Sequence, residues 1–228
     1  MKPNAILAGL AGICALIVPA PAGAVLTAPA GLLPGDSFQY VFVTSGTTTA
    51  TSTDIATYDA FVQSAAVAAG LDFYAGSPVT WLVLGSTAAV SALSREPLSF
   101  TAPIYRLDGL AVATGAPDLW DGNLLRPIQI DENGSLTTGA VWTGTDKFGV
   151  QALPFGDGAI VTRGQSDSIN ARWTNITSFF ATSLFHEYAI SPVLTVAAPI
   201  PEPASTTLFG LGLGALWTAA RRRGKNKT

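Results

Sequence analysis

Residues 38–84 decide the fold, and they read FQYVFVTSGTTTATSTDIATYDAFVQSAAVAAGLDFYAGSPVTWLVL. Aromatic and β-branched side chains fill Phe38–Val43, so this segment predicts a buried first strand. Val79–Leu84 has the same character and predicts a second buried strand. Thr44–Thr53 is almost entirely Thr, Ser, Gly and Ala, which indicates a loop after the first strand.

A helix is predicted between this loop and the second strand. Ser52 or Thr53 is expected to supply the N-cap, with Asp54 in the first turn, and Gly70 ends the helix. Its apolar residues recur at the i, i+3, i+4 spacing of a single buried face. These residues are Ile55, Tyr58, Phe61, Val62, Ala65 and Ala69.

Shorter elements are predicted after residue 84. Ser86 is expected to cap a short second helix that runs through Leu93. Asp108-Gly109 is a hairpin-type turn flanked by predicted strands at 104–107 and 110–112. Loops are predicted at 118–122, at 131–134 and around Arg172-Trp173, and a further strand at 141–145. Residues 184–196 are expected to close the domain, with one face of the strand formed by Leu184, His186, Tyr188 and Ile190.

This order of elements predicts an α+β fold. We expect a single domain with a small mixed or antiparallel sheet, one clear helix, a short second helix and long loops. Trp142 is expected in its core.

The charge of the chain is unevenly distributed. The sequence has 12 Lys and Arg against 15 Asp and Glu, a net charge of −3. Half of the basic residues lie in the two terminal segments, so residues 25–200 carry six basic and fourteen acidic side chains, a net charge of −8. Phosphate binding needs a positive surface, so nucleic acid is not expected as a partner. The single cysteine, Cys14, lies in the N-terminal apolar run, so packing rather than disulfides must stabilise the domain.

The C-terminal segment has three parts in sequence. A linker at 199–205 contains Pro201-Glu202-Pro203, and the uncharged residues 206–220 are predicted to form a hydrophobic helix. The basic end at 221–228 begins with Arg221, Arg222 and Arg223. The helix is at or below the roughly 17–25 residues that a membrane span needs. The arginines favour a cytoplasmic C-terminus. The prolines on both sides of Glu202 keep it extended and accessible to a processing enzyme.

This tail resembles the PEP-CTERM signal of Gram-negative bacteria, which exosortases recognise and process. The resemblance implies transient anchoring in the inner membrane, followed by removal of the tail and release to the cell surface or extracellular matrix. An ordinary C-terminal membrane anchor is the alternative.

The N-terminus predicts a signal peptide at 1–24. Lys2 is the positively charged region, Ala5–Val18 is the apolar region, and Ala22-Gly23-Ala24 is an A-x-A cleavage site with Ala22 and Ala24 as its small residues. The Sec machinery is therefore an expected partner. The exported α+β domain is predicted to span 25–198, ahead of the tail at 199–228.

A second resemblance covers residues 38–196. It is carried by 42–45, the helix end at 68–71, Trp81 with Ser86-Thr87, 103–109, Asp131-Glu132 and 141–145. Together these segments look like bacterial surface domains of uncharacterised function whose fold is similar to C-type lectins and endostatin. The usual cysteines and the Glu-Pro-Asn or Gln-Pro-Asp triplet are missing.

The sequence contains no recognisable catalytic motif. His186-Glu187 begins like the zinc-protease motif, but Ile190 stands where a second histidine is required, so no metal site of that kind is expected. The string Gly164-Gln165-Ser166-Asp167-Ser168 lacks the final glycine of a nucleophile elbow. His186 is therefore predicted to be a hydrogen-bonded sheet residue, and the protein is predicted not to be an enzyme.

The acidic loops offer one possible ligand site. Asp118, Asp121, Asp131 and Glu132 are oxygen ligands of the kind calcium prefers, and Trp120 could stack on a sugar ring. The same acidic residues next to Gly and Asn are typical of turn formation. The sequence thus predicts an exported, structural or adhesive protein of a biofilm or exopolysaccharide. The alternative is a glycan-binding module, with calcium as a possible cofactor.

Overall fold

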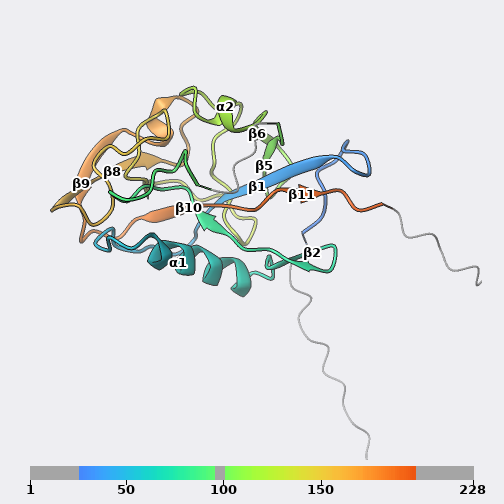
Figure 1. The fold of residues 1–228 in the computed structure, drawn as a ribbon, viewed down its shortest axis with the longest axis horizontal. Helices are drawn as coiled ribbons and strands as arrows, with labels where there is room; N and C mark the ends of the chain where they lie inside the picture. The colour runs from blue at the N-terminus through green and yellow to red at the C-terminus, as the bar shows by residue number, and fades with distance from the viewer. Residues whose placement is uncertain (1–25, 96–100, 199–228) are drawn as a thin grey trace, which may run out of the picture.

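The computed structural model describes residues 26–95 and 101–198. It has a mostly-sheet domain with two α-helices and long loops (Figure 1). The predicted signal peptide at 1–24 and the predicted tail helix at 206–220 lie outside the described residues. Within 26–95 and 101–198, no helix has the length and apolar character needed to cross a membrane.

Eleven strands and three helical segments are present in the described residues. The helices are α1 (Ile55–Ala68), α2 (Ala116–Leu119) and a 3-10 helix, η1 (Ala171–Trp173). The strands are β1 (Ser37–Val43), β2 (Phe73–Tyr74), β3 (Ser77–Pro78), β4 (Leu82–Val83), β5 (Ile104–Arg106), β6 (Ala111–Ala113), β7 (Ala140–Trp142), β8 (Ile160–Gln165), β9 (Thr177–Phe180), β10 (His186–Ile190) and β11 (Leu194–Thr195).

Nine of the strands form one mixed sheet. Its order is β6-β5-β1-β10-β7-β8-β9, with β11 paired to β1 and β4 paired to β10. The β1/β5 and β10/β7 pairs are parallel, and the other pairs are antiparallel. β2 and β3 form a separate hairpin. The predicted first strand and the hairpin around Asp108-Gly109 are therefore confirmed.

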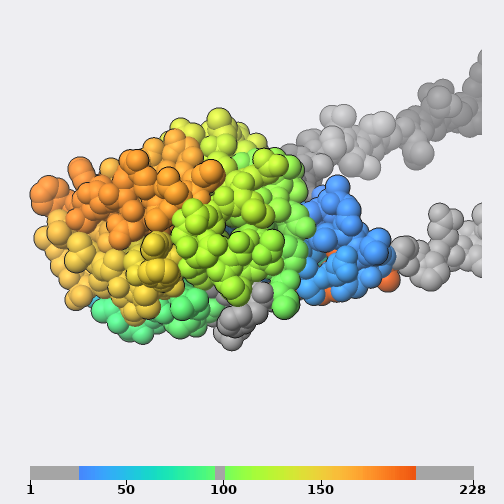
Figure 2. All heavy atoms as spheres, turned by 90° about the horizontal axis from the view of Figure 1, so that it is seen from above, coloured from blue at the N-terminus to red at the C-terminus, as the bar shows by residue number. Residues whose placement is uncertain are grey.

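The two ends of the described chain lie together. The Gly35 N–H donates to the Val196 carbonyl over 3.0 Å, and the Val196 N–H donates to the Asp36 carbonyl over 2.8 Å. Figure 2 shows the blue start of the domain beside its orange-red end. The described chain therefore ends beside the entry to β1, whereas β9 lies at the opposite end of the domain (Figure 1).

α1 begins at a different cap from the one predicted. The N-cap is Asp54, whose carboxylate accepts a 3.0 Å hydrogen bond from the Ala56 N–H. Ser52 instead accepts from the Asp54 N–H through its hydroxyl at 3.1 Å, so it supports the capping residue. The end of the helix is as predicted: Gly70 has φ +76°, a conformation that favours glycine.

Replacing Asp54 by Ala should therefore lower the free energy of unfolding by about 1 kcal/mol, because the side-chain acceptor at the helix start is lost. Thr53→Ala is the matched control, since Thr53 is exposed and does not cap the helix. Urea unfolding of the full chain measures both. Equal losses in the two variants would contradict the assignment of the cap.

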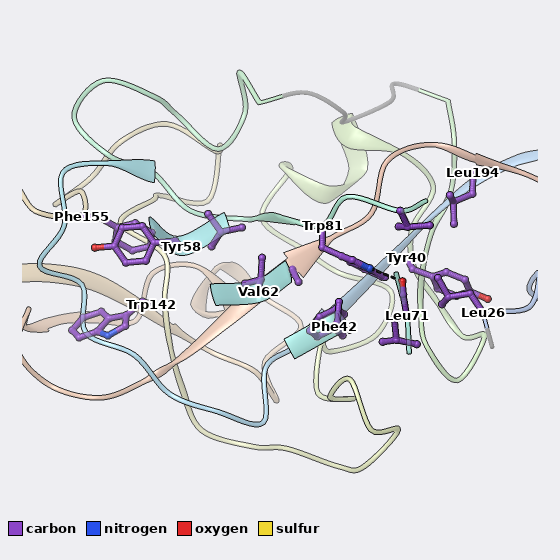
Figure 3. Close-up of a cluster of buried hydrophobic side chains, with 14 of the residues drawn as sticks. Leu26, Tyr40, Phe42, Tyr58, Val62, Leu71, Trp81, Trp142, Phe155 and Leu194 are labelled. Atoms are coloured by element: carbon purple, nitrogen blue, oxygen red, sulfur yellow. Dashed lines mark hydrogen bonds between the residues drawn. The ribbon is translucent and has the colours of Figure 1, made fainter. Parts of the chain in front are cut away.

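The core on the α1 side of the sheet is aromatic. α1 buries Tyr58, Val62 and Ala66 against it (Figure 3). The Trp81 ring lies 4.8 Å from that of Phe42, and its indole N–H donates to the Leu71 carbonyl over 2.8 Å. Packing against Phe42 and the hydrogen bond to Leu71 therefore both hold the Trp81 side chain in place.

The second predicted strand is shorter than expected, and α1 is the reason. Only Leu82–Val83 pair with β10. The N–H of Trp81 donates to the Gln63 side chain over 2.7 Å, and that of Val83 donates to the Asp59 carboxylate over 2.9 Å. Side chains of the helix thus take the place of a neighbouring strand.

The predicted helix at 86–93 is wrong. Ser86 is fully buried, its hydroxyl accepts from the Ala92 N–H over 2.9 Å, and it bonds to the Thr145 hydroxyl over 2.7 Å. Backbone bonds between Thr87 and Val90 close a turn there. The short helix of the domain is α2, which lies where a loop was predicted.

Two further predictions need correction. The region around Arg172-Trp173, predicted as loops, contains β8, β9 and η1. The last strand begins later than predicted, because Leu184 precedes β10 and is 61% exposed. His186, Tyr188 and Ile190 alternate along β10 on one face as predicted, and residues on both faces of Glu187–Ile190 are buried. β10 lies between β1 on one side and β4 and β7 on the other, with a hydrophobic cluster on each face.

Candidate functional site

The predicted ligand loops use their carboxylates to hold the backbone. Asp131 accepts from the N–H groups of Asn133 and Ser135, each over 2.9 Å, and from the Thr137 hydroxyl over 2.9 Å. Glu132 accepts from the Ser45 N–H over 2.8 Å and from the Ser45 hydroxyl. These bonds tie the 131–134 loop to the end of β1.

The other predicted pair has the same role elsewhere. Asp118 lies in α2 and accepts from the Thr114 N–H over 2.7 Å, and Asp121 accepts from the Asn123 N–H over 2.7 Å. In the part of the chain that the structure describes, no three His, Cys, Asp or Glu residues are grouped so that they could hold a metal ion. The arrangement favours the turn-forming interpretation of the acidic loops.

Trp120 and Trp142 are core residues. Trp120 is 5% exposed and packs against Trp173 with ring centroids 5.2 Å apart, so its ring is not available to stack on a sugar. This corrects the suggestion that Trp120 binds a ligand. Trp142 is fully buried, as predicted, and its indole N–H donates to the Thr48 carbonyl over 3.0 Å.

His186 is a hydrogen-bonded sheet residue, as predicted. Its Nδ1 lies 2.7 Å from the Thr44 carbonyl and 3.2 Å from the Gly46 carbonyl. Because Nδ1 donates to a backbone acceptor in this arrangement, the ring is held as part of the contact between β10 and the end of β1.

The adjacent Glu187 is the most unusual titratable group of the domain. It is fully buried, and neither of its carboxyl oxygens has a hydrogen-bond partner. Burial raises the pKa of this carboxyl well above its usual range. The pKa of the neighbouring Tyr58 is raised to about 12, first by burial and also by the charge of Glu187, against a lowering by its bond to the Ser52 backbone. Glu187 is enclosed in the core and has no access to a substrate.

A group of exposed apolar side chains, not predicted from the sequence, lies on the two faces of the β8–β9 edge and in the loop after β9. We call it the β9 surface, and its members are Ile160, Phe179, Phe180 and Leu184, which are 42%, 43%, 63% and 61% exposed. Phe179 contacts Phe185 at 5.5 Å between ring centroids, and the Arg163 guanidinium lies 5.5 Å from the Phe185 ring. Large exposed apolar patches mark interaction sites.

A sequence signal for this surface was present. Residues 174–185 contain no charged side chain, in a domain that carries a net charge of −8. Two consecutive phenylalanines in such a segment indicate either a buried strand or a contact surface. Because both rings are exposed, the structure favours a contact surface.

Comparison with known families gives one match, in the tail. Residues 199–223 match the family model of the PEP-CTERM protein-sorting motif. The matched segment contains Pro201-Glu202-Pro203 and Arg221–Arg223, the residues predicted to form the sorting signal. No curated protein matches the chain.

The motif suggests an exported protein that is sorted by an exosortase, and it implies cell-surface sorting in bacteria. It implies processing by that enzyme as well.

Proposed function

We propose that this protein is a non-enzymatic component of the cell surface or extracellular matrix of a Gram-negative bacterium. The match to the sorting motif at 199–223 carries the proposal. The chain would enter the Sec pathway through residues 1–24, be held briefly in the inner membrane by 206–220, and be released when an exosortase removes the tail.

The proposed role of the domain is structural or adhesive, within a biofilm or exopolysaccharide. Two features support it: the exposed aromatic β9 surface, and acidic side chains that serve turns rather than a reactive centre. The proposal includes no cofactor. We further propose a likeness of the fold to C-type lectins and endostatin, on the resemblance carried by segments that include 42–45 and 103–109.

Glycan binding with calcium is the alternative role. No observation favours it at the loops where it was predicted, because Trp120 is buried and the four carboxylates accept hydrogen bonds within their own loops or from Ser45.

The intact mass of the protein recovered from its native cells and culture medium tests the sorting proposal. We expect a chain that begins near Val25 and ends near Pro203. The matched control is a variant with Glu202→Gln and both flanking prolines changed to Ala, which should remain in the membrane fraction with its tail attached. A native chain that ends at Thr228 in the membrane fraction would make the tail an ordinary anchor and reject exosortase processing.

A further inference from the structure

β9 is an unprotected edge of the sheet. It is the last strand in the sheet order of the described residues and pairs with β8 alone. Natural edge strands are usually guarded by lysine, proline or a bulge. The stretch 174–185 contains neither lysine nor proline, and the four pairs between β8 and β9 run without a break in register.

The backbone of β9 presents hydrogen-bonding groups outward. Ser178 lies opposite Thr162. The Thr162 N–H donates to the Leu153 carbonyl, and its own carbonyl accepts from Thr143 and Gly144, so both groups point away from β9. Thr162 and Ser178 therefore form a non-hydrogen-bonded pair of the antiparallel ladder. In such a pair the backbone N–H and carbonyl groups of both residues point away from the opposite strand. Ser178 therefore directs its N–H group away from β8. Phe180, which lies two positions further along β9, does the same.

This edge has an exposed phenylalanine on each face. Phe179 faces Phe185, and Phe180 lies opposite Ile160 on the other face. An incoming strand would thus gain backbone hydrogen bonds and cover exposed phenylalanine surface on both sides.

We propose that β9 pairs in antiparallel fashion with β9 of a second copy of this chain. A two-fold axis beside Phe179 would place the two Phe179 residues opposite each other as a non-hydrogen-bonded pair. The Ser178 carbonyl of each copy would then accept a hydrogen bond from the Phe180 N–H of the other, while the Phe180 carbonyl already accepts from the Ser183 N–H over 2.9 Å. The contact is self-complementary, so it closes into a dimer.

The self-complementary geometry of the edge favours a second copy as the partner, and charge limits where the two copies can meet. Two domains of net charge −8 repel each other, and they can approach only where no like charges meet. The uncharged stretch 174–185 provides such a face. The dimer proposal does not depend on sorting by exosortase, so an experiment can reject one proposal without rejecting the other.

Sedimentation velocity of the mature protein tests the contact. We expect a concentration-dependent dimer in the wild type and a monomer in Phe180→Lys, because a lysine there places two positive charges across the shared edge. Leu33→Lys is the matched control, since Leu33 is 69% exposed and lies beside the domain ends, away from β9, and it should dimerise like the wild type. Circular dichroism checks that each variant is folded. A wild-type monomer at all concentrations, or a dimer unaffected by Phe180→Lys, overturns the proposal.

Cysteine trapping tests the register. Opposed residues of a non-hydrogen-bonded pair have Cα atoms about 4.5 Å apart, within disulfide range. In a Cys14→Ser background, Phe179→Cys should give a disulfide-linked dimer under mild oxidation, and Leu33→Cys should not. Equal trapping of the two cysteines overturns the pairing.

Discussion

Replacing Glu187 by Met is expected to stabilise the domain at neutral pH. The wild-type carboxyl is fully buried on β10 without a hydrogen-bond partner. Its backbone is well bonded, with its N–H donating to the Thr44 hydroxyl over 2.9 Å and its carbonyl accepting from the Thr44 N–H over 2.8 Å. The backbone of Glu187 is therefore fully hydrogen-bonded, and only its unsatisfied side chain lowers the free energy of unfolding. An apolar side chain of similar length removes an unsatisfied polar group, a gain of about 1–3 kcal/mol.

The same residue should make stability depend on pH in an unusual direction. The folded pKa of Glu187 is raised above its unfolded value, so the folded domain binds a proton more tightly than the unfolded chain. The stabilising contribution is complete below the unfolded pKa and is lost as the pH rises through the folded pKa. Between those two values the folding equilibrium weakens roughly tenfold per pH unit on account of this group.

Urea unfolding of wild type and Glu187→Gln over a pH series isolates the effect, because every other titrating group cancels in the difference. The Gln variant keeps the shape but cannot ionise, so its advantage should grow from acidic to neutral pH. Asp157→Asn, which removes an exposed carboxylate, is the control for the loss of one acidic side chain. A difference between wild type and Glu187→Gln that does not change with pH would show that Glu187 does not take up a proton on folding.

Gly164→Ala is the second substitution with a large expected effect. A Cβ at this β8 position would lie 1.8 Å from the Trp173 carbonyl oxygen and 2.5 Å from its carbon. The obstacle is backbone, since η1 packs directly on β8, and the same carbonyl accepts from the Tyr188 hydroxyl over 3.2 Å. We expect a loss of about 3 kcal/mol or more, through displacement of η1.

Gly46→Ala is the matched control for this steric effect. A Cβ there would make only an ordinary contact, 3.6 Å from the Phe61 ring, and the position has no positive φ. Thermal unfolding of the full chain, followed by the fluorescence of buried tryptophan, measures both variants. Comparable stability of Gly164→Ala and wild type would mean that η1 is not held against β8.

Local patterns predicted the elements that local chemistry determines. Phe38–Val43, the helix that ends at Gly70 and the Asp108-Gly109 turn each depend on residues within a few positions of one another. The N-cap of α1 was missed by one or two positions, and the larger failures involve distant partners. Ser86 has the residue type of a helix cap, but the Thr145 hydroxyl holds it in a buried turn.

The candidate site follows the same division. The sorting motif is a short contiguous pattern, and it was predicted residue by residue. The β9 surface depends on the pairing of β9 with β8 and on the exposure of Phe180, neither of which a single sequence segment determines. Trp120 had the residue type of a ligand platform, and only its contact with Trp173 shows that it belongs to the core.

The pairing of β11 with β1 has a mechanical consequence. Consider a force applied at Ala198 along the direction of β11, which runs toward one end of the domain, while β9 lies at the other end (Figure 1). Hydrogen bonds between antiparallel strands are perpendicular to the strands. The hydrogen bonds that join Gly35 and Asp36 to Val196 would therefore be loaded in shear, perpendicular to their own direction. They would resist the force together and would not break one after another.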